Sequence, residues 1–178
     1  MAKTCFSILL LLAALPACAF GPSRKLPDPS VVSTVDLQRY SGLWHEIAKT
    51  PNFFQRKCLR STAEYKVLDS KSISVHNSCY REKGEITDID GVATIRNLDA
   101  PTKLEVQFKI FLINPKGDYW ITELDPDYQW VVVSGPGMKY NFLLAREFPM
   151  KEETKNQIFD RLKSKNYPVE DFIFDRAE

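Results

Sequence analysis

The feature that most constrains the fold is a series of short β-type runs that recurs at near-regular spacing through most of the chain. Turn residues such as Asp69-Ser70, Asp125-Pro126-Asp127 and Gly135-Pro136-Gly137 separate consecutive runs. This spacing predicts eight strands, over residues 43–50, 59–68, 72–80, 85–97, 103–111, 117–124, 128–135 and 139–146. Because the links between them are short, we expect neighbouring strands to pair as an antiparallel meander.

Alternation of apolar and polar residues predicts which side of each strand faces inward. It is clearest in residues 103–111, where the apolar positions are Leu104, Val106, Phe108 and Ile110. In the seventh run we place Gln129 toward water, which turns Trp130 and Val132 inward. A sheet of this many strands removes its unpaired edges most economically by closing, so we expect an all-β, eight-stranded antiparallel up-and-down β-barrel.

A single amphipathic helix is predicted after the strands, over residues 151–164. Ile158, Phe159 and Leu162 share one stripe, and Glu152 and Glu153 in the first turn suit the positive end of the helix dipole. We expect the apolar stripe to pack on the outside of the barrel wall. A much shorter helical turn is expected at residues 36–41, just before the first strand.

The beginning of the chain has the pattern of an export signal. Lys3 is followed by an apolar run over residues 5–15 and then by the small residues Ala17, Cys18 and Ala19. The run is too short to span a bilayer, which takes about 20 apolar residues. We therefore expect removal of the signal, as residues 1–17 or as residues 1–19. A tether over residues 18–34 then leads to a barrel domain over residues 35–178.

Charge and motifs exclude several classes of function. The formal net charge is +1, from 24 Lys and Arg and 23 Asp and Glu residues spread along the chain, so no basic patch indicates nucleic-acid binding. The two histidines, His45 and His76, fall on different strands, and we expect both to face outward. Since the sequence contains no motif for a nucleophile, a phosphate or a metal, we expect no enzyme activity, no cofactor and no metal site.

Cys58 and Cys79 remain once the signal is set aside, and an even number in an exported chain favours a disulfide. They flank the predicted hairpin of the second and third strands. A two-residue turn would place Cys58 opposite position 81, two residues from Cys79. A small bulge or a shifted turn would be needed to bring the two cysteines within bonding distance. The alternative is a cysteine-dependent enzyme acting on a barrel-bound hydrophobic substrate. No nearby imidazole lowers the pKa of either thiol, which argues against that alternative.

Three motifs follow one another along the predicted strands: the first-strand motif Gly42-Leu43-Trp44, the loop motif Leu124-Asp125-Pro126-Asp127-Tyr128 and the eighth-strand motif Leu143-Leu144-Ala145-Arg146. Together they resemble the motifs of the lipocalin family, and most closely those of its branch of bacterial outer-membrane lipocalins and apolipoprotein D. The likeness runs from about residue 35 to residue 174. His45 departs from the branch, which usually has Tyr at that place.

The resemblance implies that Trp44 and Arg146 meet at the closed end of the barrel in a cation–π contact. It also implies a ligand cavity, and strand parity suggests that its wall consists of Tyr65, Val75, Ile95, Val106, Phe108, Ile110, Trp130 and Phe142. The expected ligand is a fatty acid, a lysophospholipid or a similar apolar molecule that the protein stores or transports. Glu46 shares the parity of Trp44 and either meets a ligand head group or, as we favour, pairs with a basic residue.

Residues 15–18, Leu-Pro-Ala-Cys, are compatible with a bacterial lipobox, although such sites prefer a residue smaller than Pro16. Together with the resemblance, this pattern implies that Cys18 carries lipid and anchors the protein to a bacterial outer membrane. The alternative, cleavage after Ala19, gives a soluble periplasmic or secreted protein. Either alternative is compatible with a homodimer.

Overall fold

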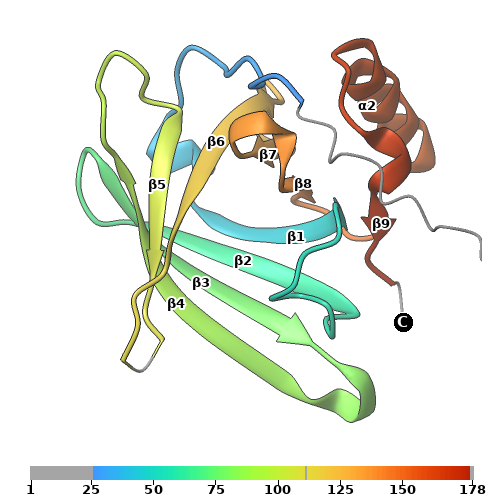
Figure 1. Cartoon of the computed structure of the whole chain (residues 1–178), viewed down its shortest axis with the longest axis horizontal. Coiled ribbons are helices and arrows are strands. Elements are labelled where there is room, and N and C mark those ends of the chain that lie inside the picture. Colours follow the sequence, from blue (N-terminus) through green and yellow to red (C-terminus); the bar gives the residue numbers. More distant parts are fainter. Residues whose placement is uncertain (1–25, 111, 177–178) are drawn as a thin grey trace, which may run out of the picture.

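The structure is a computed structural model that describes residues 26–110 and 112–176, and it contains the expected antiparallel barrel (Figure 1). Its wall consists of eight consecutive strands: β1 (Gly42–Lys49), β2 (Arg60–Val67), β3 (Ser72–Tyr80), β4 (Ile86–Ile95), β5 (Lys103–Phe108), β6 (Lys116–Leu124), β7 (Trp130–Ser134) and β8 (Asn141–Ala145). Each strand pairs with the next one along the chain, which confirms the predicted meander. The predicted export signal lies outside the described residues.

The first strand closes the barrel because it pairs with β2 along one edge and with β8 along the other. Trp44 stands opposite Ala63 of β2, and His45 stands opposite Ala145 of β8. The β1–β2 pairing ends at His45, and beyond it a ninth strand, β9 (Ile173–Phe174), pairs with β1. The sequence does not predict β9, since a two-residue strand is too short to show any periodicity.

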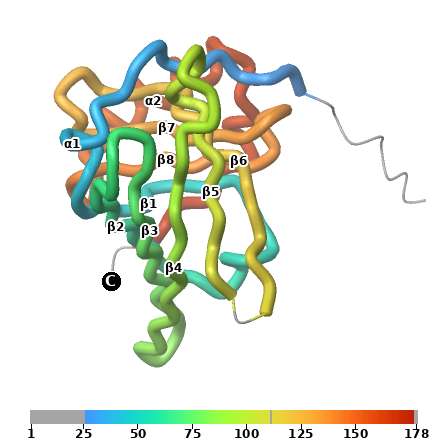
Figure 2. Tube along the Cα trace, turned by 90° about the vertical axis from the view of Figure 1, so that its left-hand side faces the viewer, coloured from blue at the N-terminus to red at the C-terminus, as the bar shows by residue number. Residues whose placement is uncertain are grey.

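The connections between strands divide the barrel into two ends. At one end, which we call the base, lie the short helix α1 (Leu37–Tyr40) and the β2–β3, β4–β5 and β6–β7 connections. At the other end, which we call the mouth, lie the connections over residues 50–59, 81–85, 109–115 and 135–140, with the 3₁₀ turns η1 (Glu82–Gly84) and η2 (Pro136–Met138) among them. Figures 1 and 2 show the β3–β4 hairpin and the β5–β6 loop projecting at the lower end of the molecule.

Two layers of apolar side chains flank the barrel wall. The inner layer fills the base of the barrel, and the outer layer lies between the wall and the helix α2 (Glu152–Ser164), where Ile158 and Leu162 are buried. Phe159 packs against Phe172, just after the 3₁₀ turn η3 (Val169–Asp171), with 5.3 Å between the ring centroids. The predicted helix over residues 151–164 and its packing on the outside of the barrel are confirmed (Figure 1).

The strand β7 faces the opposite way from the sequence prediction. Val131 and Val133 belong to the inner layer, whereas Trp130 and Val132 lie in the outer layer beneath α2. The prediction that Trp130 and Val132 face inward is therefore wrong. Gln129 still belongs to the turn before the strand, and β7 begins only at Trp130. Because both faces of β7 are covered, its first four residues are all apolar. The sequence of this strand therefore has no apolar–polar alternation that could show which residues face inward.

Residues 26–34, which the sequence predicts as part of a tether, run along the barrel. The Val32 amide donates to the Ile121 carbonyl (3.0 Å), and the Thr102 hydroxyl donates to the Val32 carbonyl (2.6 Å). Nearer the mouth, the Gly137 amide donates to the Asp28 carboxylate (2.8 Å). A composition rich in Pro and Ser predicts the lack of helix or strand found here, but it does not predict whether a segment packs against its neighbours.

The predicted disulfide between Cys58 and Cys79 is confirmed, with 5.2 Å between the two Cα atoms. The β2–β3 turn is longer than the two residues expected, because the Leu68 amide donates to the Ser72 carbonyl (3.0 Å) and Ser61 stands opposite Cys79. Cys58 precedes β2, in a turn that its own amide closes on the Gln55 carbonyl (2.9 Å). The disulfide therefore ties the β1–β2 mouth loop to β3 instead of joining two paired strand residues.

Replacing both cysteines by serine (Cys58→Ser with Cys79→Ser) should lower the free energy of unfolding by about 2–4 kcal/mol. The bond restricts the unfolded chain across a sequence separation of 21 residues, and that restriction disappears in the variant. Urea unfolding of the variant, of the oxidised wild type and of the reduced wild type measures the effect. The variant and the reduced wild type should agree, and equal stability of all three would show that the bond contributes nothing.

Candidate functional site

The base of the barrel is closed by the side chain of Arg146. Its guanidinium carbon lies 3.8 Å from the centroid of the Trp44 ring, a cation–π distance. The guanidinium also donates hydrogen bonds to carbonyl oxygens of α1 and its surroundings, those of Arg39 (2.8 Å), Tyr40 (3.2 Å), Ser41 (2.9 Å) and Leu43 (2.8 Å). One charged group thus satisfies carbonyls that a four-residue helix leaves without partners.

The three sequence motifs meet around this guanidinium. The Trp44 indole nitrogen donates to the Tyr40 carbonyl (2.8 Å), and the Arg146 side chain donates to the Tyr128 carbonyl (3.3 Å) from the loop motif. Gly42 has a φ of +93°, and a Cβ atom there would lie 3.4 Å from the guanidinium. Glycine therefore provides both the backbone conformation and the room that Arg146 needs.

The loop motif holds α1 in place over the base. Asp36 caps α1 by accepting hydrogen bonds from the Gln38 and Arg39 amides (2.8 and 3.2 Å), and its own amide donates to the Tyr128 hydroxyl (2.9 Å). Asp125 in turn shapes the loop by accepting from the Gln129 amide (3.1 Å). The motif residues Gly42, Trp44, Asp125, Tyr128 and Arg146 therefore build the base and do not line an opening.

Inside the barrel, just above the base, three tyrosine hydroxyls form a chain of hydrogen bonds. The Tyr119 hydroxyl lies 2.6 Å from that of Tyr40 and 2.9 Å from that of Tyr65. Burial raises the pKa of each of the three, so all three are neutral at physiological pH. Three hydroxyls bring three protons, and the two mutual hydrogen bonds use only two of them. One O–H is left over to donate to another oxygen.

The inner face changes in accessibility from base to mouth. At the base, Ile73, Leu104, Ile121 and Val131 are almost completely buried. Toward the mouth several inward-facing side chains are only half-buried, namely Asn77, Ile89, Phe108 and Phe142. The inner face is therefore more accessible toward the mouth than at the base.

Several small residues lie on the inner face and let larger neighbours pack closely. Ala63 stands opposite Trp44, Ala93 stands opposite Ile73, and Gly91 lies beside Phe108, where a Cβ atom would come within 2.9 Å of the phenyl ring. Asn77, opposite Ala63, has a buried side-chain oxygen for which the described residues provide no hydrogen-bond donor. A larger side chain at Gly91 would push Phe108 out of its place.

The structure places the predicted wall residues in three different settings. Tyr65, Val75, Ile95 and Val106 are buried in the inner layer, and Phe108 and Phe142 pack against that layer while half-buried. Trp130 lies outside the wall beneath α2, so it does not face the ligand space. Ile110 lies beyond the end of β5, paired with Ile113 in the mouth loop, and 41% of its surface is exposed. Its place on the rim instead of the wall follows from the early end of β5.

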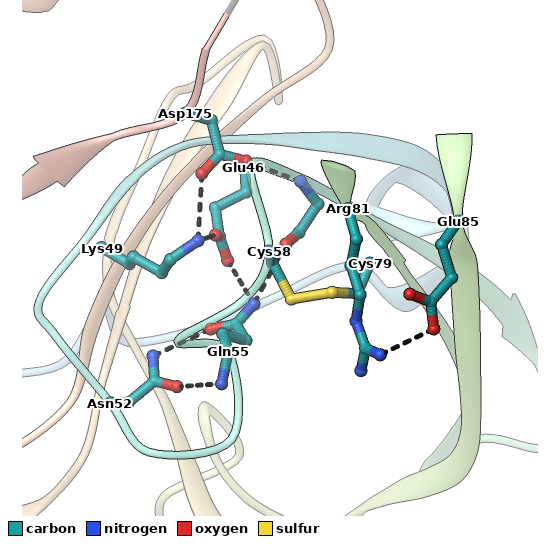
Figure 3. Close-up of a disulfide and its surroundings, with 10 residues drawn as sticks. Glu46, Lys49, Asn52, Gln55, Cys58, Cys79, Arg81, Glu85 and Asp175 are labelled. Atoms are coloured by element: carbon teal, nitrogen blue, oxygen red, sulfur yellow. Dashed lines mark hydrogen bonds and ion pairs between the residues drawn. A yellow bond between two sulfur atoms is a disulfide. The ribbon is translucent and has the colours of Figure 1, made fainter. Parts of the chain in front are cut away.

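Glu46 lies at the seam where β1 and β2 separate, in a network of buried charged groups (Figure 3). Its carboxylate pairs with the Lys49 ammonium and accepts a hydrogen bond from the side-chain amide of Gln55 (2.9 Å). Lys49 also pairs with Asp175 (3.0 Å), whose other oxygen accepts from the Ser61 amide (2.6 Å). Glu46 thus pairs with a basic residue, which is the alternative that we favour from the sequence over contact with a ligand head group. Asp175, from the far end of the chain, completes a network that sequence spacing does not reveal.

Burial dominates the electrostatics of this network. It raises the pKa of Glu46 to about 7, against the opposing effect of Lys49, and it also raises the pKa of Asp175. Burial acts to lower the pKa of Lys49, but the charges of Glu46 and Asp175 outweigh it and the pKa is raised. The two carboxyl groups therefore share the one positive charge of Lys49. They hold a proton at a higher pH than exposed carboxyl groups would.

The remaining candidate groups do not form a reactive site. Both cysteine sulfurs are taken up by the disulfide. His76 lies on the outer face with its Nδ1 2.8 Å from the Asp90 carboxylate, and burial lowers the pKa of His45 on β1. Within residues 26–110 and 112–176, no group of three or more potential metal ligands comes together. No helix in the same ranges is long and apolar enough to cross a bilayer.

Comparison with known proteins places this architecture in a family. Residues 35–177 match the family described as a lipocalin-like domain. Apolipoprotein D of Cavia porcellus is 32% identical over 173 residues, which cover 92% of this chain and 89% of the relative. The outer membrane lipoprotein Blc of Vibrio cholerae is 31% identical over 170 residues, 94% of this chain and 95% of the relative. Insecticyanin from the tobacco hornworm Manduca sexta superposes with a TM-score of 0.72 over 86% of each chain, at 24% identity, and so shares the fold.

The substitution Glu46→Gln should change how stability depends on pH. Because folding raises the pKa of Glu46 from an ordinary carboxyl value to about 7, its contribution favours the folded state at low pH and is lost as the pH rises toward 7 and above. From pH 5 to pH 8, the difference in unfolding free energy should therefore shift in favour of the variant by roughly 1–3 kcal/mol. Denaturant unfolding at both pH values measures it.

Glu64→Gln is the matched control, because Glu64 pairs with Lys66 on the exposed outer face. Its unfolding free energy should run parallel to that of the wild type between the two pH values. A parallel course for Glu46→Gln as well would contradict the raised pKa.

Proposed function

This chain belongs to the lipocalin family, and on that premise we propose that it binds a hydrophobic small molecule in the mouth half of its barrel and stores or transports it. Lipocalins are known for binding small hydrophobic ligands. The proposed ligand class is a fatty acid, a lysophospholipid or a similar molecule with one alkyl tail. The observation that carries the proposal is the inner face, which is mostly apolar and becomes more accessible from the base toward the mouth.

The apolar inner wall supports an alkyl tail on energetic grounds. A buried methylene gains about 0.8 kcal/mol, so fourteen of them would give a gross gain of roughly 11 kcal/mol. Loss of rigid-body freedom and of tail flexibility takes back several kcal/mol, which leaves an affinity in the micromolar range or better. No covalent step is needed for such binding.

The polar groups of the interior support an orientation for this ligand. Glu46 is already paired with Lys49, and the tyrosine hydroxyls near the base have one proton to spare but carry no charge. A charged head group would therefore lose its hydration without gaining an opposite charge if it went in first. We place the alkyl tail inside and the head group at the mouth.

The rival proposal, a cysteine-dependent enzyme, has no support in the geometry. Cys58 and Cys79 bond to each other, so neither offers a thiolate. His45 and His76, the two imidazoles of the chain, lie on separate strands. We propose that the protein is a carrier without catalytic activity.

The proposed cellular location is the outer membrane of a bacterium, with Cys18 as the lipid-modified residue that anchors the protein. Support comes from the lipobox-like residues 15–18 and from the likeness to a protein named as an outer membrane lipoprotein. The likeness to apolipoprotein D is equally compatible with cleavage after Ala19 and release into the periplasm or medium. Residues 15–19 lie outside the described ranges.

Titration with a fluorescent fatty acid should show saturable uptake of one molecule per chain, with displacement by lysophospholipid. The substitution Asn77→Trp should weaken this uptake at least tenfold, because the indole fills the mouth half of the inner face. His76→Trp is the matched control, since this neighbouring side chain faces outward beside Asp90. The cysteine double variant should keep its uptake. Absence of uptake by the folded wild type would rule out the carrier proposal.

Mass spectrometry of the intact protein from its native cell envelope should find a chain that begins at Cys18 with attached acyl groups. More than one acyl chain is expected, because a single one gives only marginal membrane binding. A mass that corresponds to an unmodified chain beginning at Phe20 would contradict the lipid anchor and favour the soluble alternative.

A further inference from the structure

Large apolar side chains are exposed on the loops that surround the mouth. Phe53 and Phe54 lie in the β1–β2 loop, and Leu112 and Ile113 lie in the β5–β6 loop; we call these four residues the mouth patch. Phe53 is 76% exposed and Leu112 is 84% exposed. Leaving such side chains in water is unfavourable, and four of them on loops at one end of the barrel indicate a surface that something covers. Figures 1 and 2 show the β5–β6 loop projecting from the barrel wall.

The mouth loops other than the β3–β4 hairpin carry positive charge and no negative charge. Residues 50–59, 109–115 and 135–140 contain Arg56, Lys57, Lys109 and Lys139 and no Asp or Glu, and Lys116 follows as the first residue of β6, although the whole chain has a net charge of only +1. The β3–β4 hairpin adds Arg81 and Lys83 but also Glu82 and Glu85, so it is neutral. Among the described residues, Lys116 pairs with Glu105, while the other four loop cations form no ion pair.

Cations and aromatic rings are adjacent on this rim. The Arg56 guanidinium carbon lies 4.5 Å from the centroid of the Phe53 ring, and the Lys139 ammonium lies 5.2 Å from that of Tyr140. Phe54 and Tyr140 join two mouth loops, with 5.7 Å between their ring centroids. Apolar side chains that enter a bilayer interface while neighbouring Lys and Arg meet its phosphates are the arrangement that fits an anionic lipid surface.

The chain also leaves the described structure on the mouth side. The Asp28 carboxylate binds the Gly137 amide in the β7–β8 mouth loop, and the Leu26 carbonyl lies close to the same glycine. Cys18 precedes Leu26 by eight residues, a distance of at most about 29 Å when fully extended. An attachment of that segment to a membrane would bring the mouth, and not the base, to the bilayer.

We propose that the mouth patch and the surrounding cations dock this protein on an anionic phospholipid surface with the mouth toward the bilayer. A second copy of the chain fits the surface less well, because it would bring two sets of like charges together. Docking in this orientation lets an apolar molecule pass between bilayer and barrel with little exposure to water. The proposal does not depend on what the barrel holds.

Co-sedimentation with vesicles tests the proposal on the exported chain carrying Cys18→Ala, so that no acyl group contributes. Binding to vesicles of equal parts phosphatidylglycerol and phosphatidylcholine should be at least tenfold stronger than binding to phosphatidylcholine alone, and it should weaken with salt. Phe53→Ser with Phe54→Ser should weaken binding at least tenfold. Arg56→Glu with Lys57→Glu should weaken it at least fivefold on anionic vesicles only.

The matched control is Leu68→Ser with Leu98→Ser, which removes side chains of similar exposure, 56% and 65%, from the base. This variant should bind vesicles like the wild type. Equal loss in base and mouth variants, equal binding to both vesicle types, or no binding would each overturn the proposal. A wild-type dimer in solution that the Phe53 and Phe54 substitutions dissociate would also overturn it, in favour of a second copy. All variants should keep fatty-acid uptake, which separates this outcome from failure of the carrier function.

Discussion

The contact between the Arg146 guanidinium and the Trp44 ring gives the barrel its closed end. It joins the end of β8 to β1, with 3.8 Å from the guanidinium carbon to the ring centroid, and the same guanidinium donates hydrogen bonds to carbonyls at the end of α1. A cation at this place is stabilised by the indole face and by carbonyl dipoles, and it needs no carboxylate partner. Because β1 pairs with both of its neighbours and its start is fixed here, the eight strands close around one interior with a definite base.

The mouth follows from this asymmetry. Because Tyr40, Trp44 and their neighbours fill the base, the proposed ligand would enter from the opposite end. There β1 and β2 separate, and three sets of contacts hold the seam together. The strand β9 pairs with β1, and the disulfide fixes the β1–β2 loop to β3. The ion pairs of Glu46, Lys49 and Asp175 join β1 to the C-terminal segment, which the Ser61 amide links to β2. The loops can then carry exposed apolar and basic residues, because their own packing does not have to hold the barrel together.

The strand order and the helix can be predicted from the sequence, because period-two alternation, turn residues and an amphipathic stripe are local signals. The disulfide follows from the even number of cysteines, and the contact at the base follows from the family resemblance of the three motifs. Alternation gives no information where both faces of a strand are covered, and the prediction that Trp130 faces inward is wrong for that reason. Contacts between distant segments were also missed. No local pattern pairs Asp175 with Lys49, and Tyr40, Tyr65 and Tyr119 come from three separate elements, so neither network has a sequence signal.

In the proposed complex an alkyl tail lies in the mouth half of the barrel and leaves the buried base undisturbed. A nuclear magnetic resonance titration of the isotope-labelled protein with palmitate tests this placement. The chemical-shift changes should saturate at one palmitate per chain and concentrate at Asn77, Ile89 and Phe108, with Tyr40 and Ile73 at the base little changed. Shifts confined to the outer face of the wall, or spread evenly over base and mouth, would contradict it.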